Sequence, residues 1–89
     1  MSLILIKYGP DHPAEGAKLS SAKEADCAVL IQNGVYWAAC DALKDAKCPV
    51  YAIKDDFLAR GYEEGQFDIE LIDYDALVEL IERNEGFVG

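Results

Sequence analysis

The sequence predicts a small α/β domain, built as a three-layer sandwich in which helices cover both faces of a mainly parallel four-stranded sheet. Short, continuous apolar segments recur along the chain, and such runs are typical of strands that are buried on both faces. Stretches with helix signals separate these runs, and this alternation implies right-handed crossovers between parallel strands. The chain has 89 residues, enough for a single core, so residues 1–89 are expected to form one domain.

Four segments are predicted strands. The first is the apolar run 3–6, the second is 27–31, and the third is 49–53. Pro49 can only open its strand, because proline has no N–H to give to the ladder. The fourth segment, 67–72, alternates apolar and acidic residues, which favours an edge of the sheet. We expect the first and third strands to lie centrally.

The first two predicted helices follow the first two strands. Pro13 suits the first position of a helix that extends to Glu24. Apolar residues at positions i, i+3, i+4 and i+7, counted from Tyr36, predict a second helix over residues 34–46. Cys40 lies on this apolar stripe, so its side chain is expected to face the core.

The last two predicted helices have clear end signals. Residues 55–61 begin with acids and end at Gly61, which suits a left-handed stop. Asp73 is a suitable cap for a helix over residues 74–83, with Gly86 as its terminator. The apolar face of this last helix is predicted to comprise Leu77, Leu80 and Ile81.

The charge of the chain narrows the classes of partner. There are 8 Lys and Arg residues against 17 Asp and Glu residues, a net charge of −9, and most of the acid follows residue 53. Direct binding to nucleic acid needs clustered bases that neutralise phosphates, and the sequence has no such cluster. No run is long enough to span a membrane, and no basic segment precedes an apolar stretch as in a signal peptide. We expect a cytoplasmic protein.

The candidate binding rim consists of the residues that follow the strands. Ligands of open parallel sheets bind at the carboxyl ends of the strands. Phosphate-binding fingerprints are absent, so we expect no nucleotide or flavin cofactor. The acids Asp55 and Asp56 resemble half of a metal or acid/base pair, but the start of a helix, whose dipole favours negative charge, explains them better, so we expect no metal. The rim residues are Lys7, Tyr8, Gly9, Asp11, His12, Gln32, Asn33, Gly34, Lys54, Asp55, Asp56, Asp73 and Tyr74.

Two adjacent aromatic residues indicate a protein interface. Tyr36 and Trp37 neighbour each other on a predicted helix, so one can pack in the core while the other faces outward. An exposed aromatic ring beside a small core suggests a contact with another subunit, although core positions for both rings remain an alternative. We expect the protein to be at least a dimer, with this helix in the contact.

The cysteines fit neither a disulfide framework nor a zinc site. Cys27, Cys40 and Cys48 are odd in number and include no CxxC pair, which indicates reduced thiols. A reactive thiol needs positive charge and access, whereas free cysteine is commonly a small buried hydrophobe. Cys40 is kept as the candidate nucleophile.

Three segments of the chain resemble the DsrH/TusB family of small sulfur-relay proteins. They are residues 29–38, with the QNGV turn into a helix, residues 50–61, with the VYAI and ARG motifs, and residues 72–78, which begin IDY. These segments occur in the family's order and spacing. The motif residues at the predicted rim are Gln32, Asn33, Gly34, Asp55, Asp56, Arg60, Gly61, Asp73 and Tyr74.

The resemblance implies a DsrEFH-like fold and a place in persulfide transfer. It implies oligomers with related subunits of the DsrE/DsrF or TusC/TusD type, serving tRNA wobble 2-thiouridine formation or dissimilatory sulfur metabolism. In related TusD/DsrE subunits the carrier cysteine lies near the end of the third strand, where this chain has Ala52, Ile53 and Lys54. Some DsrH proteins carry a cysteine in the first helix, and no cysteine precedes Cys27 here.

We therefore expect a non-catalytic subunit that binds its own copies or sibling subunits. One alternative is a sulfurtransferase that uses Cys40 or another of its own thiols as persulfide acceptor. A second alternative is a homo-oligomer that acts alone and has lost the sulfur role.

Overall fold

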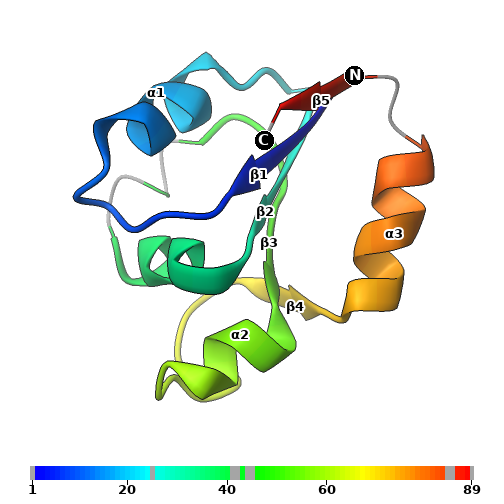
Figure 1. Ribbon diagram of the computed structural model, residues 1–89. Helices are drawn as coiled ribbons and strands as arrows, with labels where there is room; N and C mark the ends of the chain where they lie inside the picture. Colours follow the sequence, from blue (N-terminus) through cyan, green and yellow to red (C-terminus); the bar gives the residue numbers. More distant parts are fainter. Residues whose placement is uncertain (1, 25, 41–42, 44–45, 84–85, 89) are drawn as a thin grey trace.

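The computed structural model describes residues 2–24, 26–40, 43, 46–83 and 86–88, and contains a parallel sheet of the order β4-β3-β2-β1-β5 (Figure 1). The predicted α/β fold is confirmed, and a short fifth strand extends the four predicted ones. The strands are β1 (Ser2–Ile6), β2 (Cys27–Leu30), β3 (Val50–Ile53), β4 (Glu70–Ile72) and β5 (Gly86–Val88). The helices are α1 (Pro13–Ser21), the 3-10 helix η1 (Gln32–Ala39), α2 (Lys54–Ala59) and α3 (Tyr74–Arg83).

The strand order agrees with the prediction in part. β4 lies at an edge, and β1 and β3 are both interior strands, as predicted. The middle of the sheet, however, is β2, which pairs with β1 through Leu3 opposite Cys27 and with β3 through Ala28 opposite Val50. β5 was not predicted, because a segment of three residues carries too little pattern to be recognised as a strand.

The direction in which the chain crosses the sheet explains the three layers. From β1 to β4, each new strand lies next to the previous one, and the sheet grows in one direction. Right-handed crossovers between these strands therefore place α1, η1 and α2 on one face. The connection from β4 to β5 runs back across the whole sheet, which places α3 on the other face (Figure 1). One face is therefore covered by three helices and the other by α3.

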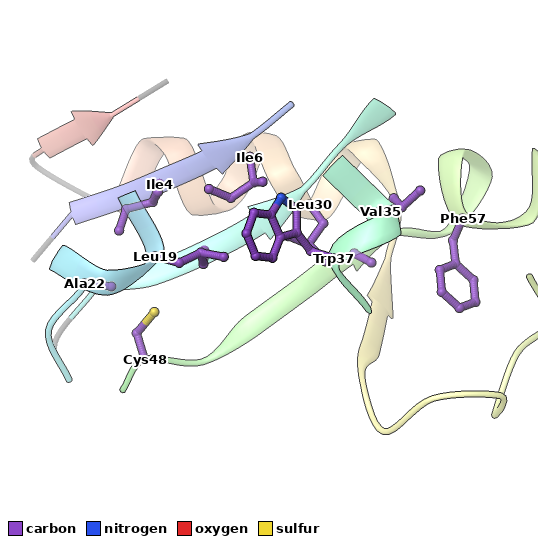
Figure 2. Packing of buried hydrophobic residues seen from close by; sticks show 11 residues of the cluster. Ile4, Ile6, Leu19, Ala22, Leu30, Val35, Trp37, Cys48 and Phe57 are labelled. Atoms are coloured by element: carbon purple, nitrogen blue, oxygen red, sulfur yellow. The ribbon is translucent and has the colours of Figure 1, made fainter. Parts of the chain in front are cut away.

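The side chains of β1 show how the core divides between the two faces. Ile4 and Ile6 belong to the buried cluster on the face that carries α1, η1 and α2, which also includes Trp37 and Phe57. Figure 2 shows Trp37 close to Ile6, and Phe57 farther along the cluster. The alternate residues, Leu3 and Leu5, point to the opposite face because successive side chains of a strand alternate. The smaller cluster of buried residues on that face is Leu3, Leu5, Val29, Ile53 and Leu77.

The second predicted helix is shorter and tighter than expected. It is a 3-10 helix that ends at Ala39, so Cys40 follows the helix and lies on no helical stripe. The Cys40 side chain still packs, partly buried, against the main core cluster, as predicted. A 3-10 helix has three residues per turn, which brings Gly34 and Trp37 to the same buried side. The predicted continuation toward Ala46 includes residues 41, 42, 44 and 45, which lie outside the described residues.

The ends of the other helices mostly follow the predicted signals. Pro13 begins α1, which ends at Ser21 and not at Glu24. Gly61 has a φ of +86°, the left-handed conformation expected of a glycine stop after α2. Helix α3 ends at Arg83 as predicted, but Gly86 begins β5 and Ile81 is exposed. Among the described helices, none combines the length and apolar character needed to cross a membrane.

Candidate functional site

The polar side chains that follow β2, β3 and β4 meet around Asp56. This residue lies in the first turn of α2, directly after β3. Its Oδ2 atom accepts the backbone N–H of Gln32 at 2.8 Å and the hydroxyl of Tyr74 at 2.8 Å. Gln32 follows β2, and Tyr74 begins α3 after β4, so a single carboxylate joins the carboxyl ends of three neighbouring strands.

Arg60 closes the other side of this arrangement. Its Nε and Nη2 atoms donate to Asn33 Oδ1 at 3.2 Å and 3.1 Å, and its Nη1 donates to the backbone oxygen of Asp56 at 3.3 Å. Nη1 also lies 3.9 Å from Asp56 Oδ1, so Arg60, which directly follows α2, forms an ion pair with Asp56 four residues earlier. We refer to Gln32, Asn33, Asp56, Arg60 and Tyr74 as the rim cluster.

The backbone conformation of the QNGV motif places Gln32 and Asn33 in the rim cluster. Gln32 has a φ of +51°, a left-handed conformation that is uncommon for a residue with a side chain. Gly34 packs directly on β1, because a Cβ atom at this position would lie 1.8 Å from the backbone oxygen of Ile6. Glycine is thus needed at this close approach, and the Asp56 carboxylate stabilises the strained Gln32 by accepting its N–H.

The rim cluster also affects the titration of Tyr74. The hydrogen bond to the Asp56 carboxylate raises the pKa of Tyr74, and partial burial and the charges of Asp56 and Asp55 act in the same direction. Arg60 opposes this rise in pKa only in part. The phenol therefore remains a proton donor at neutral pH, which is the form that its contact with Asp56 requires.

The other predicted rim residues have local structural roles or stay separate. Asp73 Oδ1 accepts the backbone N–H of Ala76 at 2.8 Å, so it caps α3 as predicted. Asp55 is exposed, and the side chain of its neighbour Lys54 pairs with Glu64 at 3.1 Å. In the described part of the chain, no group of three His, Cys, Asp or Glu residues is arranged to hold a metal ion.

A buried carboxylate that was not predicted lies close to the rim. Glu15, in the first turn of α1, is 1% exposed, and its Oε2 accepts the backbone N–H groups of Lys7 and Tyr8 at 2.7 Å and 3.0 Å. Its Oε1 lies 2.8 Å from Lys18 Nζ. Burial alone would raise the pKa of Glu15, but the Lys18 ammonium and the two backbone N–H groups together hold this pKa below its ordinary value. The pair of Glu and Lys three residues apart was the available signal.

The two adjacent aromatic residues of η1 divide between core and surface. Trp37 is buried, and its Nε1 donates to the backbone oxygen of Tyr8 at 3.0 Å. Trp37 is therefore a core residue and cannot supply the predicted outward ring. Tyr36 is 39% exposed and contacts Tyr62 edge-on, so it is the outward residue of the pair. Tyr8 is itself exposed and stacks on His12.

The three motif segments that meet in the rim cluster lie within the part of the chain that a known family matches. The family model described as DsrH like protein matches residues 14–86. The chain belongs to the DsrH-like family. Among curated proteins, none matches the chain.

Two solved structures are closely similar to this DsrH-like chain. Both are NMR structures of Tm0979 from Thermotoga maritima, which is 52% identical over the full length of both chains. Their TM-scores are 0.79 and 0.75, so the DsrH-like fold is shared throughout. The second of these structures describes Tm0979 as a proposed sulfur transferase.

The thiols of this DsrH-like protein lie outside the rim cluster. Cys27 begins β2 and Cys48 precedes β3, so both are at the amino ends of their strands, opposite the rim. Cys48 is buried, and this burial raises the pKa of its thiol, with smaller contributions from Asp26 and Cys27. Cys40 is partly exposed and lines a cavity of about 440 Å³. The other residues around this cavity are Ala38, Leu43, Val50, Phe67, Asp68 and Ile69.

Proposed function

We propose that the protein is a non-catalytic subunit of a cytoplasmic sulfur-relay system, where it binds partner subunits and does not itself carry the persulfide. The observation behind this proposal is the rim cluster. In it, polar groups of the three motif segments form hydrogen bonds with one another. Such a cluster fixes the shape of a surface and leaves no nucleophile in it. The description of Tm0979 as a proposed sulfur transferase supports a link to sulfur chemistry.

The positions of the thiols support a role without catalysis. A persulfide carrier needs an accessible thiol with a lowered pKa. Cys48 has the opposite properties, since it is buried and its pKa is raised. The end of β3, where related carrier subunits have their cysteine, is occupied by Ala52 and Ile53, and Lys54 follows.

The expected partners are further copies of the chain and sibling subunits of the DsrE/DsrF or TusC/TusD type. The pathway served is either tRNA wobble 2-thiouridine formation or dissimilatory sulfur metabolism. For contacts between copies we propose the surface around Tyr36, because an exposed ring next to a small core gains from burial in an interface. Sedimentation tests this location, since Tyr36→Ala is expected to weaken a dimer and an unchanged dimer would contradict it.

A second candidate function is persulfide acceptance by Cys40. The observation that favours it is the apolar cavity of about 440 Å³ that this partly exposed thiol lines. In that reaction the Cys40 thiolate would attack the outer sulfur of a donor persulfide, form a new persulfide on Cys40 and release the donor as its thiolate. In a further alternative, the protein is a homo-oligomer that acts alone.

Mass spectrometry distinguishes these candidates. The protein is incubated with a low-molecular-weight persulfide and then mapped for added sulfur, with Cys40→Ser as the matched variant. A non-catalytic subunit gains no sulfur on any cysteine beyond what the unfolded chain gains. A single adduct on Cys40 that is lost in the variant would contradict the leading proposal and support the second.

A further inference from the structure

Helix α3 carries an exposed apolar stripe beside its buried side. Tyr74, Val78 and Ile81 occupy positions i, i+4 and i+7, so they follow one another along the same side of the helix. Their exposed fractions are 46%, 52% and 40%, whereas Leu77 on the buried side is 7% exposed. Single exposed apolar residues are ordinary on a protein surface, but three adjacent ones on one helix form a continuous patch. We call Tyr74, Val78 and Ile81 the α3 stripe.

A row of carboxylates borders the α3 stripe. Asp75, Glu79 and Glu82 also have the spacing i, i+4 and i+7, one position along from the stripe, and all three are exposed. Arg83 is the one base of α3, at its last position. The helix therefore presents the apolar stripe with a row of acidic residues beside it. Such a surface is complementary to a partner whose apolar residues are flanked by basic ones.

The position of α3 leaves this surface open and holds part of it rigidly. In the described part of the chain, α3 is the helix on its face of the sheet, and only its buried side, with Leu77 and Leu80, packs on that face. The first residue of the stripe, Tyr74, is fixed by its 2.8 Å hydrogen bond to Asp56. A large side chain held in place loses little conformational freedom on binding and so makes an effective anchor.

We propose that the α3 stripe and its acidic margin dock a basic amphipathic helix of a partner protein. The partner helix would place its own apolar side chains against Tyr74, Val78 and Ile81, and its Lys or Arg side chains against the carboxylate row. This proposal names the chemistry of a partner, and it rests on the proposed function only in that a partner protein exists.

Charge decides between a basic partner and a second copy of the chain. Two copies meeting at this surface would bring two rows of three carboxylates together, between molecules that each carry a net charge of −9. Like charges across an interface oppose association, whereas a basic helix meets complementary charge. The contact at Tyr36 proposed for copies of the chain lies on η1, on the other face of the sheet.

The probe for this surface is a synthetic helical peptide of about 18 residues, with Leu at helical i, i+3, i+4 and i+7 spacing and Lys on both sides of the Leu line. Its matched control has Glu in place of every Lys. Each peptide is titrated into the full chain at physiological salt, and backbone amide shifts are followed by NMR. The Lys peptide is expected to shift amides of residues 74–82 most strongly, and the Glu peptide is expected to leave them unchanged.

Paired variants separate apolar contact from charge. Val78→Ser with Ile81→Ser is expected to weaken binding of the Lys peptide about tenfold, because both side chains lie at the centre of the contact. Leu58→Ser is the control, since Leu58 is 43% exposed on a different helix. Glu79→Gln with Glu82→Gln is expected to weaken binding about fivefold. Its control, Glu24→Gln with Glu63→Gln, changes the net charge equally at exposed positions elsewhere.

Three outcomes would overturn the proposal. The first is a set of shifts centred outside residues 74–82, and the second is equal weakening by the test and control variants. The third is self-association of the chain that Val78→Ser with Ile81→Ser abolishes, since the stripe would then bind a second copy. None of these measurements depends on sulfur transfer, so the proposal can fail while the proposed function stands, and the reverse.

Discussion

The Oε2 atom of Glu15 lies 2.7 Å from the backbone nitrogen of Lys7, so the first turn of α1 is joined directly to the end of β1. The same oxygen accepts the next backbone N–H, that of Tyr8. One buried carboxylate thus satisfies two backbone donors at the point where the chain leaves the sheet. Without it these donors would need other partners, because buried polar groups that lack hydrogen bonds are costly.

Glu15→Gln is expected to lower the free energy of unfolding by about 2 kcal/mol near neutral pH, since an amide loses the ion pair with Lys18 and weakens both backbone contacts. The pKa of Glu15 is lowered in the folded state, so its contribution is present above the ordinary carboxyl pKa and is lost as pH falls through the folded value. Urea unfolding of the original chain and of Glu15→Gln, at neutral and acidic pH, measures the difference in free energy of unfolding. Glu24→Gln, at an exposed site, is the control. A destabilisation by Glu15→Gln that persists at low pH would contradict a stabilising role of the ionised Glu15 carboxylate.

Tyr74→Phe is expected to lower the free energy of unfolding by about 1 kcal/mol, because it removes the hydrogen bond to Asp56 and leaves the ring in place. The pKa of Tyr74 is raised in the folded state, so this contribution is complete below the ordinary phenol pKa and is lost as pH rises through the folded value. Unfolding from neutral to alkaline pH tests the claim, with Tyr36→Phe as a second exposed tyrosine. An equal loss of stability in Tyr74→Phe and Tyr36→Phe would show that the contact of Tyr74 with Asp56 does not stabilise the fold.

Gly34→Ala is expected to destabilise the fold by about 3 kcal/mol or more, since the new Cβ would overlap the backbone of β1 at Ile6. Gly16→Ala is a matched substitution inside α1, where the Cβ would meet Trp37 at an ordinary 3.6 Å. It is expected to stabilise by up to about 1 kcal/mol through helix propensity. The midpoint of thermal unfolding should fall for Gly34→Ala and rise for Gly16→Ala. A Gly34→Ala variant of unchanged stability would refute the close approach of Gly34 to β1.

Cys48 is expected to be the slowest of the three thiols to react with iodoacetamide in the folded protein. It is buried and its pKa is raised, and both properties lower the concentration of accessible thiolate. We further expect no thiol to react much faster than a free cysteine. Peptide mapping after timed alkylation at neutral pH measures the three rates, and rapid labelling of Cys48 would contradict its burial.

The strands and most helix ends could be predicted from the sequence because their signals are local. Apolar runs, the proline that begins α1 and the glycine that follows α2 each act within a few residues. The rim cluster depends instead on contacts between distant positions, such as Gln32 with Asp56 and Asn33 with Arg60. Spacing could place these residues at one end of the sheet, but it could not pair them.

The predictions that were wrong concern segments where packing overrides local pattern. Helical spacing around Tyr36 indicated an α-helix, but Gly34 is drawn against β1 and the segment forms a tighter 3-10 helix. In this helix Trp37 is buried and Tyr36 is exposed, and Cys40 lies beyond the helix end. Ile81 has the spacing of a core residue, yet it is exposed because only the side of α3 with Leu77 packs on the sheet.

The place of β5 beside β1 has a consequence for the rate at which the fold forms. The pairs from β1 to β4 join strands that follow each other in the chain, so they can form by short loop closures. The pair of Ser2 with Gly86 joins positions near opposite ends of the 89-residue sequence, and this long closure has a larger entropic barrier. Folding should therefore show an early phase that assembles four strands and a later phase that adds the fifth. In native-state hydrogen exchange, the amides of β5 should open well before those of β2, which is paired on both sides.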